Sequence, residues 1–307
     1  MVSVIIPAFN AEKTIEETLN SIFKQSFKDF EIIVVNDGST DQTLKVLNLF
    51  KSKVKIINTP NMGVSYAREN GLKYAVGNFI QFLDADDILS PNKFNIQRKA
   101  LIDNNADIAY GDWQKFHTIK DQIIILETVR KKLENDLERS LFTDFWCPPA
   151  AIMYSKKIAD QLIWKKNLPI IQDARYLLDA AIIGGKFIYT PGVMALYRDN
   201  QSDSLSKISE LKFVSDCLTN AIEIYNIWLG QNKFTIERQQ AVIGVLRYCI
   251  NRLTIYDRNL AEKAINFLLR IDSKYIPFEK GYLRYISKVF GYKNAERLAG
   301  LKRRLIK

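Results

Sequence analysis

Three aspartates, Asp84, Asp86 and Asp87, lie within four residues directly after the apolar run 79–83. Carboxylates this close together repel one another, so solvent or a cation must offset their charge. Ligand sets made only of oxygen favour Mg²⁺ or Mn²⁺ over zinc. The spacing therefore predicts a divalent metal site at the end of a strand. The alternative, from these residues alone, is an Asp-rich turn that leads into a helix at Ser90-Pro91.

The chain has too few histidines and cysteines for several other kinds of site. His117 is its single histidine, so a zinc hydrolase or a Ser-His-Asp triad would depend on that one ring. Cys147, Cys217 and Cys249 are odd in number and far apart, which favours buried thiols over a disulfide framework or a paired-cysteine metal site. The glycine-rich loops of dinucleotide and NTPase sites are also missing from the sequence.

Length and composition are those of a globular protein. The chain has 307 residues, 47% of them hydrophobic and 25% charged, which suits one large domain with an addition. No apolar run approaches the roughly eighteen residues of a membrane span, and residues 1–7 lack the features of a signal peptide. We therefore expect a cytoplasmic protein.

Strands and helices alternate in the first third of the chain and must position these aspartates. Apolar runs predict strands over 2–7, 31–36, 54–58 and 79–83, and amphipathic segments predict a helix after each of them. This alternation is typical of an α/β fold with a Rossmann-like, mostly parallel sheet.

Parallel strands bring their carboxyl ends to one edge of the sheet, where open α/β folds bind ligands. The loop after the first strand, Asp37 and the segment 84–87 should therefore meet. A metal held by Asp84 and Asp86 could bind a diphosphate, and Asp37 would then be free to accept a hydrogen bond from a base. The edge predicts a nucleotide-diphosphate site.

The remainder of the chain is more mixed and then helical. Strands are expected over 108–114, 123–128, 150–154, 186–190 and 193–198, with helices near 137–142 and from Gln172-Asp173 to residue 183. After residue 206 only helical periodicity remains. We expect a domain over 1–205 and a helical C-terminal extension over 206–307.

Five motifs together closely resemble family 2 of the inverting glycosyltransferases, which have the A-type nucleotide-sugar fold. The resemblance covers about residues 1–205. It is carried by the segments 4–10 and 34–41, by Asn61-x-Gly63-x-x-x-Ala67-Arg68, by the segment 82–87 and by Gln172-Asp173.

The resemblance implies a nucleotide-sugar donor, most often a UDP-sugar, and Mg²⁺ or Mn²⁺ as cofactor. It implies a nucleotide-sugar half over about 1–115 and an acceptor half over about 116–205. The acceptor would be a saccharide or lipid-linked saccharide in polysaccharide or lipopolysaccharide assembly. The implied nucleotide-sugar contacts are Pro7, Ala8, Phe9, Asn10, Asp37, Arg68, Asp84 and Ala85, with Asp86 on the metal and Asp173 as the catalytic base.

Three residues depart from the family pattern. Gln172 replaces a usual Glu before the catalytic Asp, Glu69 replaces a frequent Asn, and Asn200 stands where the family often has His. Asn200 could still offer an oxygen ligand to the metal. The departures leave a second hypothesis open, in which the chain binds a sugar nucleotide as a weakly active partner subunit of a glycan-assembly complex.

Basic residues are concentrated at the C-terminus. The net charge is +10, and most of it lies in residues 277–307. Lys280, Arg284 and Lys288 recur at helical spacing beside apolar residues, which is typical of a helix that rests on an anionic bilayer. The alternative is a solvated basic face over a packed helix. We expect no nucleic-acid partner, because no recognisable binding module is present.

Overall fold

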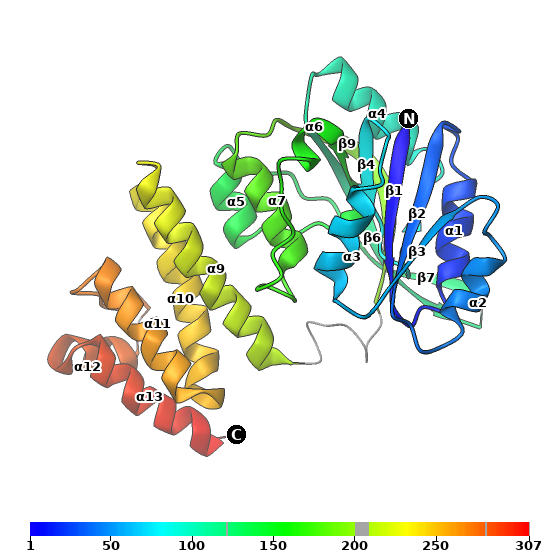
Figure 1. The fold of residues 1–307 in the computed structure, drawn as a ribbon. Coiled ribbons are helices and arrows are strands. Elements are labelled where there is room, and N and C mark those ends of the chain that lie inside the picture. The colour runs from blue at the N-terminus through cyan, green and yellow to red at the C-terminus, as the bar shows by residue number, and fades with distance from the viewer. Residues whose placement is uncertain (121, 200–208, 280, 307) are drawn as a thin grey trace. The chain divides into compact units, whose positions relative to one another are not determined.

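The computed structural model describes residues 1–120, 122–199, 209–279 and 281–306. Two compact units make up the chain, Met1–Ser204 and Leu205–Lys307. We call them the α/β unit and the helical unit. Both are drawn in Figure 1, the first from blue to green and the second from yellow to red.

The first four strands of the α/β unit form a parallel sheet. They are β1 (Val2–Ala8), β2 (Phe30–Asp37), β3 (Lys55–Thr59) and β4 (Phe79–Phe82), with β1 between β2 and β4. Every residue of β1 is buried, as expected for a central strand covered on both faces. The connecting helices are α1 (Ile15–Phe23), α2 (Thr43–Asn48), α3 (Val64–Leu72) and α4 (Lys93–Asp103). The predicted mostly parallel α/β sheet is confirmed.

The second half of the α/β unit extends this sheet with strands of both directions. The sheet order is β3-β2-β1-β4-β8-β6-β9-β5, and β7 pairs with β6. The added strands are β5 (Ile88–Leu89), β6 (Ile108–Ile119), β7 (Gln122–Val129), β8 (Ile152–Ser155) and β9 (Phe187–Arg198), and the added helices are α5 (Leu137–Thr143), η1 (Pro149–Ala151), α6 (Lys156–Ala159) and α7 (Gln172–Ile182).

One strand prediction in this half is wrong. The segments 186–190 and 193–198 were expected as two strands, but β9 runs through both of them. Its pairing with β6 skips Pro191 and Gly192, so the two residues between the expected strands form a bulge within one strand. Gly192 has a φ of +99°, a conformation that suits a residue without a side chain.

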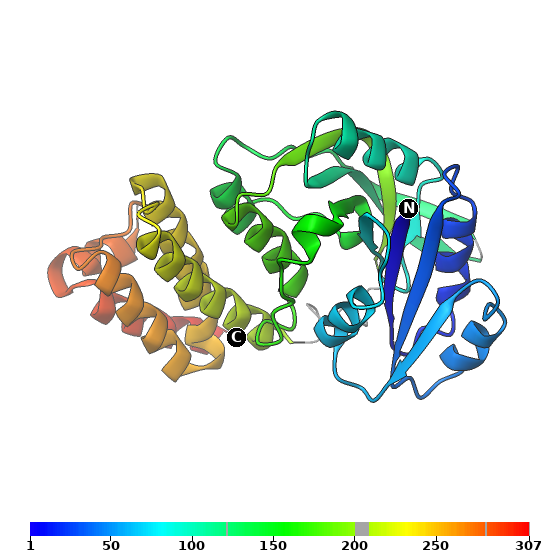
Figure 2. The same ribbon diagram turned by 45° about the horizontal axis from the view of Figure 1, so that its top comes forward.

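The helical unit consists of α9 (Glu210–Gly230), α10 (Ile236–Tyr256), α11 (Arg258–Ile271), α12 (Tyr282–Phe290) and α13 (Tyr292–Ile306). Figure 2 shows α9, α10 and α11 lying side by side. Their core consists of the fully buried residues expected from the helical periodicity, including Val214, Leu246 and Leu253. Among the helices described, none combines the length and low charge that a membrane span requires.

The three cysteines are free thiols, as expected. Cys147 and Cys249 are buried, and Cys217 is half-buried. Burial raises the pKa of all three thiols, which keeps them protonated near neutral pH.

Candidate active site

The loops that follow β1 and β2 are joined directly. Asn10 donates from its backbone nitrogen to Ser39 Oγ at 3.0 Å, and its Oδ1 accepts from the backbone nitrogen of Thr40 at 2.8 Å. Pro7 and Ala8 are buried in β1, whereas Phe9 and Asn10 are exposed beyond the end of the strand. The first loop thus presents two of its four predicted residues to a ligand.

Asp37 is buried at the end of β2 and organises the loop after β3. Its carboxylate accepts from the backbone nitrogens of Met62 at 2.9 Å and Gly63 at 2.8 Å, and from Thr59 Oγ1 at 3.1 Å. A carboxylate has about four lone-pair sites. Asp37 is therefore less free than the sequence suggested, with about one site left for a ligand.

A glycine makes the approach of these loops possible. Gly38 has a φ of +71°, and a Cβ there would lie 2.6 Å from the backbone nitrogen of Asn61. Any side chain at this position would push the loop after β3 away from Asp37. This contact explains physically why Gly38 follows Asp37 in the second motif.

Arg68 connects three separate parts of the site. Its side chain is almost wholly buried, forms an ion pair with Asp84 and donates to Gln172 Oε1 at 2.6 Å. Its guanidinium carbon lies 4.6 Å from the centre of the Trp164 ring. Arg68 therefore links α3, the end of β4 and the start of α7, and Gln172 supplies an acceptor where the family usually has Glu.

The two other aspartates after β4 differ in their surroundings. Asp86 is half-buried, and burial together with the negative charge of Asp84 raises its pKa to about 6. Asp87 is wholly buried, and burial and the charges of Asp86 and Asp84 hold its pKa well above the usual range. The backbone nitrogen of Arg198 donates to Asp87 Oδ1 at 2.9 Å. Asp87 is thus part of the core, while Asp84 and Asp86 remain accessible.

Arg198, at the end of β9, holds this acidic turn in place. Its Nε donates to the backbone oxygen of Asp86 at 2.8 Å, and its Nη1 donates to Thr118 Oγ1 at 2.7 Å. It also forms an ion pair with Glu17 of α1. The sequence had drawn attention to Arg198 only as a neighbour of Asn200. Asn200 itself lies outside the described residues.

The acidic turn is suited to a divalent cation. Burial, and after it the charges of the neighbouring carboxylates, raises the pKa values of Asp86 and Asp87, and a bound cation would offset those charges. Within the described ranges, no three His, Cys, Asp or Glu side chains are grouped so that they could hold a metal. A cation would therefore take Asp86 as its carboxylate ligand and the rest of its oxygens from water and a bound diphosphate, as Mg²⁺ commonly does.

Asp173 lies in the first turn of α7 and is not its N-cap, which is Ile171. Its Oδ2 accepts from Trp146 Nε1 at 3.1 Å. Burial raises the pKa of Asp173, and the positive charge of Arg68 partly opposes this rise. Because Arg68 contacts Asp84 and the neighbouring Gln172, it joins the acidic turn to the segment that carries Asp173.

Three aromatic rings surround the side of the site where Asp173 lies. The centroid of Trp146 is 5.3 Å from that of Trp113 and 5.2 Å from that of Tyr197. Burial, followed by the charges of the acidic turn and Asp173, raises the pKa of Tyr197. The motifs gave no sign of this cluster, because its members come from β6, β9 and the loop before η1 and have no common spacing.

Comparison with known proteins identifies the family. The model of Glycosyl transferase family 2 matches residues 3–162. An uncharacterized glycosyltransferase of Haemophilus influenzae is 33% identical over 272 residues, which is 84% of this chain and 98% of that protein. The chain belongs to glycosyltransferase family 2. It is therefore a glycosyltransferase, as the motifs predicted.

Other relatives match a shorter part of the chain. The Escherichia coli protein WfgD, a UDP-Glc:alpha-D-GlcNAc-diphosphoundecaprenol beta-1,3-glucosyltransferase, is 40% identical over 116 residues, 37% of this chain and 46% of WfgD. GlyA of Streptococcus pneumoniae is 35% identical over 119 residues, 38% of this chain and 17% of GlyA. The matched region thus spans less than half the length of either relative.

Solved structures share the fold. Residues 1–349 of S. aureus TarS superpose with a TM-score of 0.67 at 20% identity, covering 100% of this chain and 92% of that one. The mannosyltransferase PcManGT of Pyrobaculum calidifontis, in complex with GDP-Man and Mn²⁺, gives a TM-score of 0.56 at 14% identity and covers 99% and 86%. At these identities the likeness concerns the fold alone.

Proposed function

We propose that this family 2 glycosyltransferase is metal-dependent and inverting, and that it transfers a sugar from a nucleotide-diphosphate donor to an acceptor hydroxyl. A UDP-sugar is the favoured donor, because WfgD is named for UDP-Glc and TarS has been solved with UDP-GlcNAc. The observation that carries the proposal is the chain of contacts Asp84–Arg68–Gln172, which joins the acidic turn to the helix of Asp173.

The donor would occupy the edge formed by the loops after β1, β2 and β4. In this proposal Phe9 and Asn10 form the first wall of the nucleotide site, with Pro7 and Ala8 supporting them from within β1. Asp37 uses its remaining acceptor site for the base. Arg68, Asp84 and Ala85 lie at the ribose and diphosphate side. Mg²⁺ or Mn²⁺ on Asp86, with Asn200 as a candidate further ligand, would offset negative charge on the departing diphosphate.

Asp173 would act as the general base. Its carboxylate takes the proton of the acceptor hydroxyl as the acceptor oxygen bonds to the anomeric carbon and the bond from that carbon to the diphosphate breaks. An Asp has a reference pKa of about 3.9, so it takes the proton late, once the attacking oxygen has become acidic. The hydrogen bond from Trp146 holds the carboxylate in place for this transfer.

The aromatic cluster of Trp113, Trp146 and Tyr197 would bind the acceptor. Aromatic rings present a rigid apolar face with little conformational freedom to lose. A saccharide held there lies beside Asp173, which is where its hydroxyl must be. We propose a saccharide or lipid-linked saccharide of cell-surface polysaccharide or lipopolysaccharide assembly, in keeping with the diphosphoundecaprenol substrate in the name of WfgD.

Release of nucleoside diphosphate tests the function directly. A panel of nucleotide sugars is incubated with the full chain in Mg²⁺, in Mn²⁺ and in EDTA, and release is followed with and without acceptor. We expect release from a UDP-sugar that EDTA abolishes and that added metal restores. Donor binding without release under any condition would support the alternative of a sugar-nucleotide-binding partner subunit.

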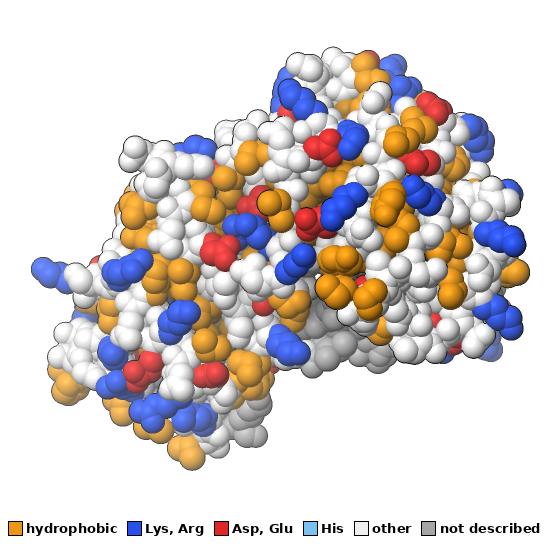
Figure 3. Space-filling view, viewed as in Figure 1, with side chains coloured by type: hydrophobic (Ala, Val, Ile, Leu, Met, Phe, Trp, Pro, Cys, Tyr) orange, Lys and Arg blue, Asp and Glu red, His pale blue; other side chains and the backbone are white. Residues whose placement is uncertain are grey.

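A peripheral membrane contact through residues 277–307 is also proposed. The exposed fractions of Tyr282, Tyr285, Val289 and Phe290 on α12 are 47%, 72%, 59% and 63%, so the apolar face of this helix is turned to solvent and is not packed on the unit. Figure 3 shows basic and apolar side chains interspersed over the helical unit. This combination suits the surface of an anionic bilayer. Lys280 and Lys307 lie outside the described residues.

Vesicle co-sedimentation tests the membrane contact. Replacing Tyr285 and Phe290 with Ser should release the full chain from vesicles that contain phosphatidylglycerol, because two exposed rings no longer insert. Replacing Leu49 and Ile163 with Ser is the matched control, since both are exposed apolar residues of the α/β unit. Equal sedimentation of both double variants would contradict the contact.

A further inference from the structure

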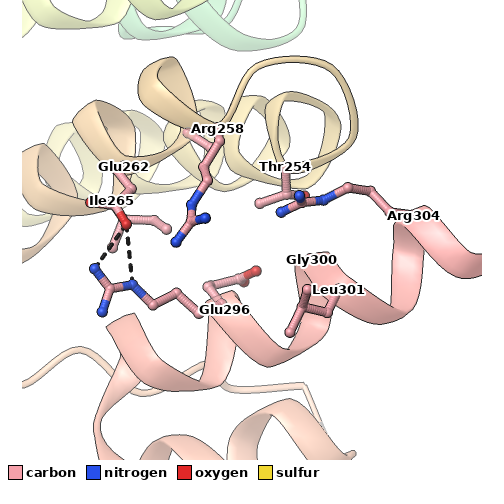
Figure 4. A pocket seen from close by; sticks show the side chains of 10 residues that line it. Thr254, Arg258, Glu262, Ile265, Glu296, Gly300, Leu301 and Arg304 are labelled. Carbon is pink, nitrogen blue, oxygen red and sulfur yellow. Dashed lines mark hydrogen bonds and ion pairs between the residues drawn. The ribbon is translucent and has the colours of Figure 1, made fainter.

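A small cavity lies in the helical unit, separate from the glycosyl-transfer site. It has a volume of about 90 Å³ and lies between α13, α11 and the end of α10 (Figure 4). Pockets that enclose a whole small molecule are larger, at roughly 300–1,000 Å³. The cavity could therefore accommodate one end of a ligand, but not a nucleotide sugar.

The two carboxylates at this cavity are already neutralised. Arg297 donates to Glu262 Oε1 from Nη2 at 2.8 Å and from Nε at 3.1 Å, and these bonds lower the pKa of Glu262. Glu296 is buried and accepts from Arg303 Nη1 at 2.9 Å and from the hydroxyl of Tyr292 at 3.0 Å. Arg297 is thus the main partner of Glu262 and Arg303 that of Glu296, and Arg258 adds only a weaker attraction to Glu262.

Two further arginines at the cavity are exposed and form no direct ion pair within the described residues, and only the charge of Arg258 acts on a cavity acid, where it helps to lower the pKa of Glu262. Arg258 at the start of α11 and Arg304 on α13 have no hydrogen bond or ion pair with any residue in the described part of the chain. In Figure 4 the guanidinium of Arg258 points into the cavity, and that of Arg304 lies beside Thr254. Two positive charges at one small cavity repel each other unless an anion lies between them.

We propose that this cavity binds the phosphate group of a phosphate ester. Arginine has a rigid fork of donors that matches phosphate oxygens, and two arginines would balance the roughly two negative charges of a phosphomonoester. Gly300 leaves the space open on the α13 side, where a Cβ would lie 3.1 Å from Thr254 Cβ. Ile265 and Leu301 add apolar surface for the carbon part of the ester.

The test compares two double variants of the full chain by thermal unfolding in inorganic phosphate. The first is Arg258→Gln with Arg304→Gln. The second is Lys263→Gln with Lys274→Gln, which removes the same charge from exposed positions of the helical unit away from the cavity. Phosphate stabilises most proteins because it is excluded from their surface, and this effect is common to all three proteins. Only a further rise in Tm that saturates with phosphate concentration indicates binding at the cavity.

We expect the saturable rise in the wild type and in the lysine variant, and an affinity lower by about tenfold or more in the arginine variant. Vesicles of phosphatidylcholine with and without phosphatidic acid then identify the source of the phosphate. If binding of the chain to vesicles requires both phosphatidic acid and the two arginines, the ligand is a lipid headgroup. If the Tm rise saturates with phosphate but the chain shows no such vesicle binding, the ligand is a soluble phosphate ester. An identical phosphate dependence in all three proteins would overturn the proposal.

Discussion

The acidic turn of the α/β unit and the cavity of the helical unit differ in the sign of the charge that is in excess. At the first, Asp84 pairs with Arg68, Arg198 lies beside Asp86 and Asp87, and burial together with the neighbouring carboxylates raises the pKa values of Asp86 and Asp87. At the second, both acids are paired with other arginines, and Arg258 and Arg304 form no direct ion pair in the part of the chain that the structure describes. An excess of charge of one sign attracts a ligand of the opposite sign. The acidic turn therefore favours a bound cation, and the cavity favours a bound anion.

The largest expected effect is at the general base. Replacing Asp173 with Asn should lower the rate of nucleoside diphosphate release to acceptor by roughly 10²–10⁴-fold, the range for loss of general base catalysis. Asp86→Asn should abolish the metal dependence together with the activity. Asp103→Asn, an exposed carboxylate at the end of α4, is the matched control. Unchanged turnover in both site variants would remove the proposed site.

Arg68 should matter for stability as well as for donor binding. Arg68→Met leaves Asp84 and Gln172 without their common partner, which should cost roughly 3–5 kcal/mol of unfolding free energy, as for other broken buried pairs. Denaturant unfolding measures this loss. Lys99→Met, at an exposed position of α4, should change little. A variant as stable as wild type would show that the ion pair does not connect the two segments.

Arg303 pairs with Glu296, a residue that lines the cavity, and so allows a paired arginine to be compared with the unpaired ones. Arg303→Gln leaves the buried Glu296 with only the hydroxyl of Tyr292, so unfolding free energy should fall by about 3 kcal/mol, the lower end for a buried pair. Denaturant unfolding in phosphate-free buffer is the measurement. A loss below about 0.5 kcal/mol would mean that Glu296 does not depend on this arginine.

Trp146→Phe should mainly affect the general base, Asp173. The ring is kept, and loss of the hydrogen bond to Asp173 should cost about 1 kcal/mol, or about fivefold in kcat. That bond lowers the pKa of Asp173, so its loss raises this pKa and should move the acid limb of the pH–rate profile to higher pH. A lower rate with an unmoved acid limb would indicate a role in packing or acceptor binding alone.

The smallest effect on folding is expected for the unpaired arginines. Arg258→Gln with Arg304→Gln should change the unfolding free energy by less than about 0.5 kcal/mol in phosphate-free buffer, because neither exposed side chain loses a direct hydrogen bond or ion pair with a described residue. The unfolding free energies of this double variant and of Arg303→Gln are measured under the same conditions and compared. A large loss in the double variant would show that these two arginines have structural partners and are not held for a ligand.

Local patterns in the sequence determined the parallel half of the sheet and the family. Apolar runs identify β1 to β4, and the parallel topology brings the loops after these strands to one edge of the sheet. The sequence alone therefore predicts that Asp37 and Asp84–Asp87 lie at the same edge. The Asp-Gly pair after the second strand and the short motif that ends in Arg68 can each be recognised as a family motif. These features could be predicted because they depend on a few neighbouring residues.

The tertiary structure decided which charges are satisfied and which are not. The sequence left Arg68 free to be a solvated helix residue, and only folding buries it between Asp84 and Gln172. Trp146 reaches Asp173 from 27 positions away, and Arg198 reaches the acidic turn from 112. Hydrogen bonds and ion pairs over such separations depend on packing, and no periodicity or spacing encodes them. For the same reason the outward-facing apolar side of α12 became visible only in three dimensions.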